Sequence, residues 1–471
     1  MPAANSWSDN DSYSEFDPLN SLLSELTVDE DSVEEINHTL SLPSRFKNRR
    51  RKAAIALTIV WSSTIALHLA SWGYLFVLGL STIVGLHALV VVFARPRIYP
   101  EAIQGELPFI SLLVAAKNEE AVIGNLAKNL CSLKYPQDQY EVWIVDDNSS
   151  DNTLSVLSKV AKEYSNLKIL RRSPDATGGK SGALNQVLPL TKGEIIAVFD
   201  ADAQVDPDLL THVVPIFQRK QVGAVQVRKA IANSKDNFWT QGQAAEMALD
   251  TFLQSHRSAI GGIGELRGNG QFVRRQALNR CGGWNEETIT DDLDLTLRLH
   301  LDKWDIECVF DPSVKEEGVT SALALWHQRN RWAEGGYQRY LDYWDLLFRN
   351  RLGTRKTLDM LVFMLTMYIF PTAAVPDLFM AAIRHRPPMF APVTSIVVSM
   401  SMTGMFAGLS RIRKDKKFRI SSYLLILLQT LHGTIYMLHW FFVISSAAAR
   451  MSVRPKRLKW VKTVHQGKVN S

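Results

Sequence analysis

Acidic residues end two apolar stretches of the chain. Asp146 and Asp147 close the stretch EVWIVDD, and Asp200 and Asp202 close the stretch EIIAVFDAD. Residues i and i+2 of an extended chain point the same way, so the carboxylates of Asp200 and Asp202 can face one divalent cation. Hard cations that serve phosphate substrates bind one or two carboxylates together with phosphate oxygens. The pair therefore indicates a metal site for a phosphorylated substrate.

A lysine in the stretch DATGGKSGALN is a second candidate for phosphate binding. The segment GGKS around Lys180 is similar to the end of a P-loop, which needs a further glycine where this chain has Pro174. Proline has no N–H to offer a phosphate, so a P-loop is excluded. The turn at residues 115–119, after the first predicted strand, has no glycine, and this disfavours a dinucleotide site.

The stretch TITDDLDLTLRLHL places three acids at the start of a predicted helix. Thr290 is a suitable N-cap, and acids in the first turn suit the helix dipole. Asp291, Asp292 and Asp294 are more acids than capping needs, so this helix start is a candidate site for chemistry.

The stretch WHQRNRWAEGG is predicted to be helical. Gln328, Arg331 and Trp332 have the spacing i, i+3, i+4 and share one helix face. Arginine offers a planar fork to phosphate oxygens, and tryptophan offers a surface for stacking. A basic helix near a membrane can equally be an interfacial anchor, and the stretch alone leaves both interpretations open.

Short apolar runs alternate with amphipathic stretches in the middle of the chain. Strands are predicted at 108–116, 141–147, 167–172, 194–202 and 222–227, with helices at 118–131 and from 151 onward. This alternation predicts an α/β fold with a doubly wound, mainly parallel sheet. Ligands of such sheets bind outside the carboxyl ends of the strands, which is where the acidic pairs lie.

Long uncharged segments flank this region. Residues 53–93 contain no Asp, Glu, Lys or Arg, which suffices for two membrane spans of about 20 residues each. Three more apolar segments follow at 358–383, 389–409 and 420–448. Because basic loops stay on the cytoplasmic side, the clusters at 45–52, 95–97, 349–356 and 411–419 predict a cytoplasmic domain between two membrane modules.

The basic tail, residues 450–471, conflicts with a topology of three C-terminal spans, because three spans would place this tail on the side of the membrane opposite the cytoplasm. A re-entrant segment 420–448 that turns near Gly433 would keep every basic cluster inside. Alternatively, segment 358–383 is interfacial, which moves the cluster at 411–419 outside. The sequence leaves this choice open.

These patterns divide the chain into five parts. Residues 1–44 contain ten Asp or Glu and no Lys or Arg, which predicts a disordered acidic tail. The three cysteines have no metal-ligand spacing and suggest free thiols in a reducing compartment. The predicted parts are the acidic tail 1–44, two spans 45–97, the cytoplasmic domain 98–350, the C-terminal membrane module 351–449 and the basic tail 450–471.

The motifs, taken in order, resemble those of the membrane-embedded family 2 glycosyltransferases, which include cellulose, hyaluronan and chitin synthases and their non-processive relatives. The resemblance covers about residues 108–345. This chain has Asn148 where the family's first turn has glycine, and Asp291 where its Thr-Glu-Asp motif has glutamate. Asparagine also tolerates the left-handed conformation, and Asp291 keeps the charge.

The resemblance implies a GT-A nucleotide-diphospho-sugar transferase fold with a Rossmann-like sheet, and it implies a role for each motif. Asp292 would be the catalytic base, Trp332 would form the acceptor floor, and Asp200 and Asp202 would hold Mg²⁺, with Mn²⁺ as a possible substitute. The residues implied in donor binding are Asp146, Asp147, Lys180, Asp200, Gln328, Arg329 and Arg331.

Within the family, the acidic start, the short length and the lack of a regulatory domain are most similar to cyanobacterial members that glucosylate a lipid. Their likeness implies transfer of glucose from UDP-glucose to the sn-3 hydroxyl of diacylglycerol, in the thylakoid or plasma membrane, with no nucleic-acid partner. A processive polysaccharide synthase is an alternative, but its channel normally needs six or more spans. A catalytically inactive scaffold that binds nucleotide-sugar is another, although pure binding does not need Asp292.

Overall fold

The computed structural model describes residues 46–99, 105–413 and 420–454. The predicted acidic tail 1–44 lies outside the described residues, as do residues 414–419 of one basic cluster and residues 455–471 of the basic tail.

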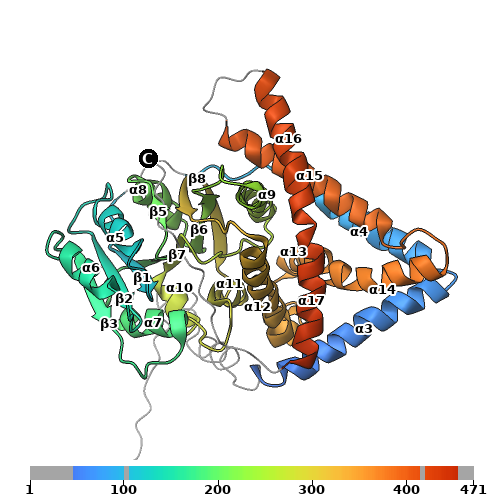
Figure 1. Cartoon of the computed structure of the whole chain (residues 1–471), viewed down its shortest axis with the longest axis horizontal. Helices are drawn as coiled ribbons and strands as arrows, with labels where there is room; N and C mark the ends of the chain where they lie inside the picture. Colours follow the sequence, from blue (N-terminus) through green and yellow to red (C-terminus); the bar gives the residue numbers. More distant parts are fainter. Residues whose placement is uncertain (1–45, 100–104, 414–419, 455–471) are drawn as a thin grey trace, which may run out of the picture. The chain divides into compact units, whose positions relative to one another are not determined.

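An eight-stranded mixed sheet forms the centre of the middle domain (Figure 1). Its strand order is β3-β2-β1-β4-β7-β6-β8-β5. The strands are β1 Ile110–Ala116, β2 Tyr140–Asp146, β3 Leu167–Arg171, β4 Ile195–Phe199, β5 Gln204–Val205, β6 Val222–Ile231, β7 Gln271–Arg274 and β8 Asp305–Glu316.

The predicted, mainly parallel sheet is confirmed. Strands β3, β2, β1 and β4 are parallel neighbours and β6 pairs with β8 in parallel, whereas β7 runs antiparallel to both β4 and β6, and β5 antiparallel to β8. The five predicted strands are present. β5, β7 and β8 were not predicted because β5 and β7 have two and four residues, and β8 contains charges and Pro312.

Alternating side chains of the central strands bury the two faces of the sheet. On β1, Leu112 and Val114 pack on one face and Leu113 on the other. The first face is covered by α5, α6 and α8, and the second by α7, α10 and α11. These helices are α5 Ile123–Cys131, α6 Thr153–Val160, α7 Gly179–Val187, α8 Leu209–Val213, α10 Arg275–Arg280 and α11 Asp291–Leu301. The doubly wound arrangement is therefore confirmed.

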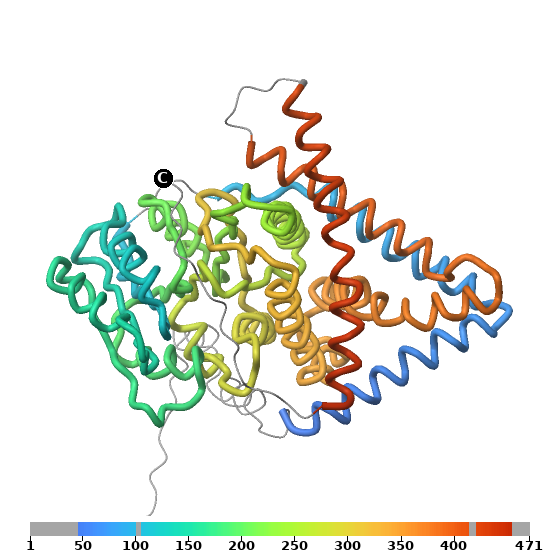
Figure 2. Tube along the Cα trace, viewed as in Figure 1, coloured from blue at the N-terminus to red at the C-terminus, as the bar shows by residue number. Residues whose placement is uncertain are grey.

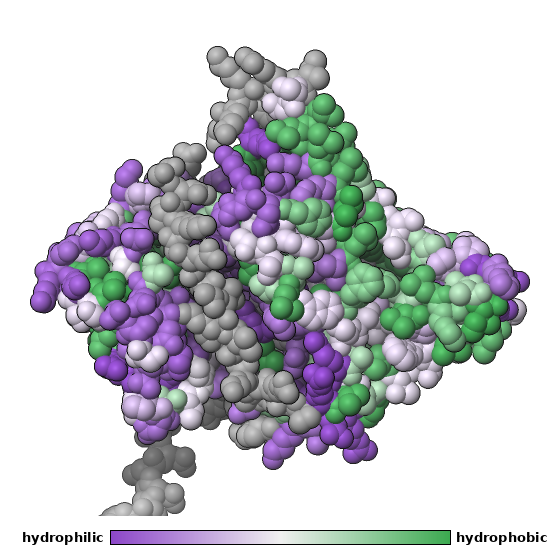
Figure 3. Space-filling model, viewed as in Figure 1, coloured by the Kyte–Doolittle hydropathy of each residue, from purple (hydrophilic) through white to green (hydrophobic). Residues whose placement is uncertain are grey.

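Apolar helices flank the sheet domain, and in the described part of the chain five helical segments are long and apolar enough to cross a membrane. In Figure 3, apolar residues gather over the helices on the right of the view and hydrophilic residues over the domain on the left. The helices are α3 Arg49–Leu69, α4 Gly73–Val92, α13 Thr354–Met364, a π-turn at Leu365–Ile369, α14 Phe370–Ile383, α15 Ala391–Ile412, α16 Ile420–Met437 and α17 His439–Val453.

The re-entrant turn near Gly433, one of the two alternatives that the sequence left open, is not formed. Gly433 lies inside α16, and the helix is interrupted only at Leu438, before α17 begins. Figure 2 shows the trace of α16 continuing into α17 without reversing direction.

Two long helices connect the sheet domain to the apolar helices. Helix α9, Phe238–Ala259, packs against α15 and α16, and α12, Ala322–Phe348, packs against α17 and α3. At the start of α3, Arg49 Nε donates to Asp342 Oδ1 of α12 over 2.8 Å. Helix α12, which carries the predicted residues Gln328, Arg331 and Trp332, therefore also contacts the candidate spans.

Candidate active site

One cavity of about 1390 Å³ lies at the carboxyl ends of the parallel strands and extends toward the apolar helices. It brings together eight of the ten predicted site residues. These are Asp147, Lys180, Asp200, Asp202, Asp292, Gln328, Arg331 and Trp332. Asp146 and Arg329 do not line it.

The turn after β2 places Asp147 in the cavity and Asp146 beneath it. Asn148 has the left-handed conformation, with φ 54°, as expected for a glycine-like position. Asp146 is fully buried, and its Oδ1 accepts the Ser149 N–H over 3.1 Å. Asp146 thus supports the turn and does not line the cavity, and its predicted part in donor binding stays a prediction. Asp147 Oδ1 accepts from the buried guanidinium of Arg172 over 2.5 Å.

Lys180 lies in the first turn of α7, two residues after the N-cap Gly178, whose φ is 82°. A Cβ at Gly178 would overlap the carboxylate of Glu286, so the turn needs glycine. The Lys180 ammonium donates to Asp200 Oδ1 over 2.5 Å. Burial opposes both charges, but their mutual attraction outweighs it, so the pKa of Lys180 is raised and that of Asp200 is lowered.

The Asp-x-Asp segment differs from the expected extended chain. Strand β4 ends at Phe199, and Asp200 to Asp202 lie in the turn that follows. Asp202 Oδ2 accepts the Glu317 N–H over 3.0 Å. Among the described residues, no cluster of three or more His, Cys, Asp or Glu side chains could hold a metal. Two carboxylates on one cavity still fit Mg²⁺, which completes its ligand set with phosphate oxygens and water.

Asp292 lies at the start of α11, at the junction between the sheet and the apolar helices. Burial and the neighbouring charge of Asp291 raise its pKa to about 6. Its Oδ1 accepts the Leu293 N–H over 2.8 Å. Thr290 occupies the N-cap position as predicted, but its hydroxyl makes no capping bond. A carboxylate with this pKa is suited to accept a proton near neutral pH.

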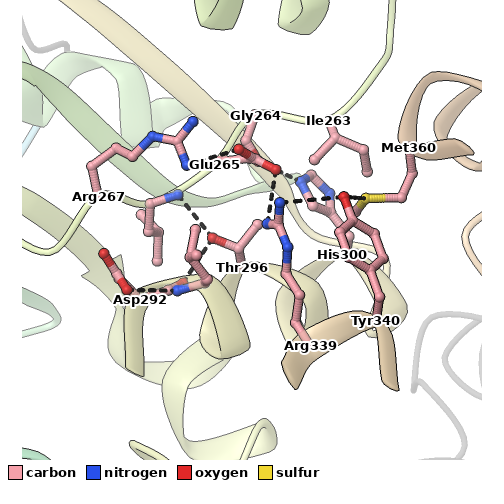
Figure 4. Close-up of polar contacts among 12 residues, drawn as sticks. Ile263, Gly264, Glu265, Arg267, Asp292, Thr296, His300, Arg339, Tyr340 and Met360 are labelled. Atoms are coloured by element: carbon pink, nitrogen blue, oxygen red, sulfur yellow. Dashed lines mark hydrogen bonds and ion pairs between the residues drawn. The ribbon is translucent and has the colours of Figure 1, made fainter. Parts of the chain in front are cut away.

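Hydrogen bonds behind Asp292 fix the start of α11 (Figure 4). Thr296 Oγ1 donates to the Asp292 carbonyl oxygen and accepts the Leu266 N–H, both over 2.8 Å. Arg267 lines the cavity and forms 2.8 Å ion pairs with Asp250 and Glu265. Glu265 also binds Arg339 of α12 over 2.8 Å, so α9, α11 and α12 share one polar network.

Helix α12 carries Gln328, Arg331 and Trp332 into the cavity, as the spacing predicted. A Cβ at Gly335 would overlap the Thr290 hydroxyl, and the missing side chain therefore lets α12 reach the start of α11. Burial lowers the pKa of Arg331, although Asp200, Asp292 and Asp291 oppose this shift. Arg331 thus adds a cation beside the carboxylates of Asp200, Asp291 and Asp292.

Arg329 points to a different place. Only 1% of this residue is exposed, and its guanidinium forms an ion pair with Glu246 of α9 and donates to the Tyr436 hydroxyl of α16 over 3.1 Å. It also lies 4.0 Å from the centre of the Trp332 ring. Successive helix positions point about 100° apart, so two residues separated by two positions face nearly opposite sides: Arg331 lines the cavity while Arg329 joins α12 to the apolar helices.

The cations in or beside the cavity that were not among the predicted residues include Arg172, Lys229 and Arg267. Arg172 directly follows β3, and Lys229 lies on β6. Lys229 Nζ is 2.9 Å from Glu316 and 5.3 Å from the centre of the Trp332 ring. The rule that selected Asp147 and Asp200, polar residues at or after the carboxyl ends of strands, also applies to Arg172. No sequence pattern marked Arg267.

This fold and cavity define a class of protein. A family model described as glycosyltransferase like family 2 matches residues 108–335. The chain belongs to the family 2 glycosyltransferases.

Curated relatives match over the whole chain. It is 73% identical over 467 residues to the beta-monoglucosyldiacylglycerol synthase of Trichormus variabilis, a match that covers 99% of both chains. It is 51% identical over 465 residues to the enzyme of the same name from Synechocystis sp., which covers 98% of this chain and 96% of the relative.

Proposed function

We propose that the protein transfers glucose from UDP-glucose to the sn-3 hydroxyl of 1,2-diacylglycerol, with inversion at the anomeric carbon. One observation carries the proposal: a single cavity joins the donor-side residues Lys180 and Asp200, the basic carboxylate Asp292 and the candidate membrane spans. A lipid acceptor can reach such a site without leaving the bilayer. Full-length similarity to beta-monoglucosyldiacylglycerol synthases supports the choice of donor and acceptor.

The proposed reaction needs a base and a stabilised leaving group. Asp292 accepts the proton of the acceptor hydroxyl while its oxygen bonds to the anomeric carbon and the bond to the UDP oxygen breaks. A positioned base of this kind contributes typically about 10²- to 10⁴-fold. Negative charge grows on the departing UDP, and the cations Arg331 and Lys180 lie on the same cavity. A single displacement inverts the configuration and gives a β-glucoside.

Mg²⁺ belongs to the proposal as a partner of the donor. Asp202 and Asp200 would hold it together with the diphosphate oxygens, and it would supply charge neutralisation at the leaving group.

The test of the proposed function is a donor and acceptor panel on the purified full chain. We expect UDP-glucose with diacylglycerol to give one product, a monoglucosyl lipid in the β configuration, identified by mass and NMR. A long polymer would point to a processive synthase instead. UDP release that is equal and low with and without diacylglycerol would reject the transferase.

Removing Lys180 should weaken use of the donor. We expect Lys180→Ala to raise the KM for UDP-glucose about 10- to 100-fold, because a charged hydrogen bond contributes about 1.5–3 kcal/mol. Steady-state kinetics with varied UDP-glucose measures the effect. Lys192→Ala, a lysine of the same domain that does not line the cavity, is the control. Membrane insertion should be unaffected, and unchanged donor kinetics in Lys180→Ala would reject this role.

Removing the divalent cation should weaken binding of the product nucleotide. We expect the affinity of the wild type for UDP, measured by titration calorimetry, to fall at least about tenfold when EDTA replaces Mg²⁺. In Asp202→Asn, the affinity should depend much less on Mg²⁺. If wild-type affinity is the same under both conditions, the two aspartates do not bind the nucleotide through a cation.

We further propose that the catalytic domain is cytoplasmic and that α16 and α17 lie along the membrane surface. The second part is supported by contacts that α16 and α17 make with the catalytic domain along their length. His432 lies 3.0 Å from a carbonyl oxygen at the start of α9, Trp440 donates to Glu246 over 2.7 Å, and Arg450 donates to Asn330 of α12. They extend over about 27 Å of helix, whereas a crossing helix would leave the domain within a few turns.

Four spans place all the basic clusters, including 450–471, on one side. We therefore expect the C-terminus to be cytoplasmic. An epitope added after Ser471 should be labelled in bacterial spheroplasts only after permeabilisation. The matched control is Arg386→Cys, in the loop between α14 and α15, which should react with a membrane-impermeant maleimide in intact spheroplasts. Labelling of the C-terminal epitope without permeabilisation would show that α16 and α17 cross the membrane.

A further inference from the structure

The active-site cavity extends beyond the catalytic residues into the apolar helices. Its volume of about 1390 Å³ exceeds the roughly 300–1,000 Å³ of ordinary small-molecule pockets. Three of the five candidate spans contribute to its wall. We call the apolar part the acyl pocket, and define it by the lining residues Leu249, Leu253, Met367, Val398, Met405 and Phe441.

A π-turn forms part of this wall. It interrupts a candidate span at Leu365–Ile369, and its residues Thr366, Met367 and Tyr368 line the cavity. Such turns inside α-helices are frequent at functional sites. The Tyr368 hydroxyl fits against Gly336, where a Cβ would overlap it. The π-turn is thus in direct contact with α12, the helix that carries Arg331.

Two residues that line the cavity are also partly exposed. Val398 of α15 is 38% exposed, and Leu438, between α16 and α17, is 60% exposed. Val398 lies on a proposed span, and Leu438 lies at the junction of the two helices proposed to follow the membrane surface, so a passage between them would lead from the bilayer into the cavity. Arg267 directly precedes Gly268, which lies beside Asp292, and it forms an ion pair with Asp250 of α9. Leu249 and Leu253 of the acyl pocket lie on the same helix as Asp250, so the wall has a polar section next to both Asp292 and the acyl pocket.

We infer that the acyl pocket binds one acyl chain of the lipid acceptor and that the chain enters between α15 and the α16–α17 junction. The inference rests on the proposed function and adds the place and the chemistry of acceptor binding. The order of surfaces along the cavity matches the order of groups in a diacylglycerol: the hydroxyl at Asp292, the glycerol esters at Arg267 and Asp250, and the hydrocarbon in the acyl pocket. The acyl chain is already out of water in the bilayer, so the hydrophobic effect does not drive it into the pocket. Contact with the pocket instead selects the length and position of the acyl chain.

The test fills the pocket and varies the chain. Met367→Trp places a large ring in the acyl pocket, and Leu378→Trp adds the same ring to an outward position of α14 that is 49% exposed. We expect Met367→Trp to lower kcat/KM for long-chain diacylglycerol at least about tenfold and for dioctanoylglycerol clearly less. UDP affinity should stay at the wild-type value. Leu378→Trp should remain within about twofold of wild type with both acceptors.

A second measurement does not depend on the folding of a variant. A diacylglycerol with a diazirine near the end of one acyl chain is photolysed with the wild-type full chain, and labelled peptides are identified by mass spectrometry. We expect label on the segments that contain Leu253, Met367 and Val398. Two outcomes would overturn the acyl pocket alone, provided that the wild type glucosylates diacylglycerol. One is label confined to outward positions such as Leu378, and the other is a Met367→Trp variant that equals wild type on long-chain diacylglycerol. A wild type that glucosylates no diacylglycerol would overturn the proposed function itself.

Discussion

Asp292→Asn should reduce glucosyl transfer by about 10³-fold or more while UDP still binds with wild-type affinity. The amide cannot accept the proton of the acceptor hydroxyl, and a general base contributes typically about 10²- to 10⁴-fold. Asparagine keeps the size of the side chain and an oxygen that can accept the Leu293 N–H, so the start of α11 should keep its structure. The measurement is product formation in single-turnover and steady-state assays, beside calorimetric UDP titration.

The pH profile gives an independent readout of the same carboxylate. The active form of Asp292 is the deprotonated one, and its pKa is raised to about 6. Activity should therefore be nearly constant well above pH 6 and fall about tenfold per pH unit below it. Asp291→Asn removes the neighbouring charge that helps to raise this pKa, so the acidic limb should move to lower pH. A wild-type limb near pH 4, or an Asp292→Asn variant with near wild-type turnover, would contradict the assignment of the base.

Arg331→Ala and Arg329→Ala should fail in different ways, although the two residues are two positions apart on α12. Arg331→Ala should lower kcat by about 10²- to 10³-fold, because it removes a cation from the cavity where charge develops. Its thermal stability should stay close to wild type. Arg329→Ala should instead destabilise the protein by about 3–5 kcal/mol, since it leaves the carboxylate of Glu246 buried without its partner. Thermal unfolding in detergent and the kinetics of the surviving fraction distinguish the two outcomes.

A second substitution checks the reason for the Arg329 effect. Glu246→Gln in the Arg329→Ala background removes the unpaired charge while keeping groups that can bond to Tyr436 and Trp440. Part of the lost stability should return. If Arg329→Ala is as stable as wild type but strongly raises the KM for UDP-glucose, Arg329 binds the donor, and its ion pair with Glu246 does not stabilise the fold.

Local rules were sufficient for the donor side of the site. The carboxyl ends of β2 and β4 do carry the cavity-lining acids, Lys180 does begin a helix beside Asp200, and Asn148 does take the left-handed conformation. Each follows from a preference that acts over a few residues: strand alternation, the geometry of turns, or the periodicity of a helix. Such preferences survive folding because no distant partner is needed to satisfy them.

Neighbouring residues with the same charge were not separated by these rules. Asp146 and Asp147 differ in role because β2 ends between them, and Arg329 and Arg331 differ because Glu246, which lies 83 residues away in the chain, binds only the first. The antiparallel β7 likewise depends on a four-residue segment finding β4 and β6. Pairing over such separations depends on which partner is buried beside which, and local sequence patterns do not contain that information.

By itself, the sequence predicted the α/β class, the apolar segments and the acids at the strand ends, and its resemblance to the family 2 glycosyltransferases implied Asp292 as the candidate base. Tertiary structure decided which of these residues share one cavity, where Asp146 and Arg329 point, that α16 passes through Gly433 without turning, and that the cavity continues past Arg267 into the apolar helices. The physical reason is the range of the interactions. Period and turn preference act within a few residues, whereas a cavity and a buried ion pair exist only when distant helices pack together.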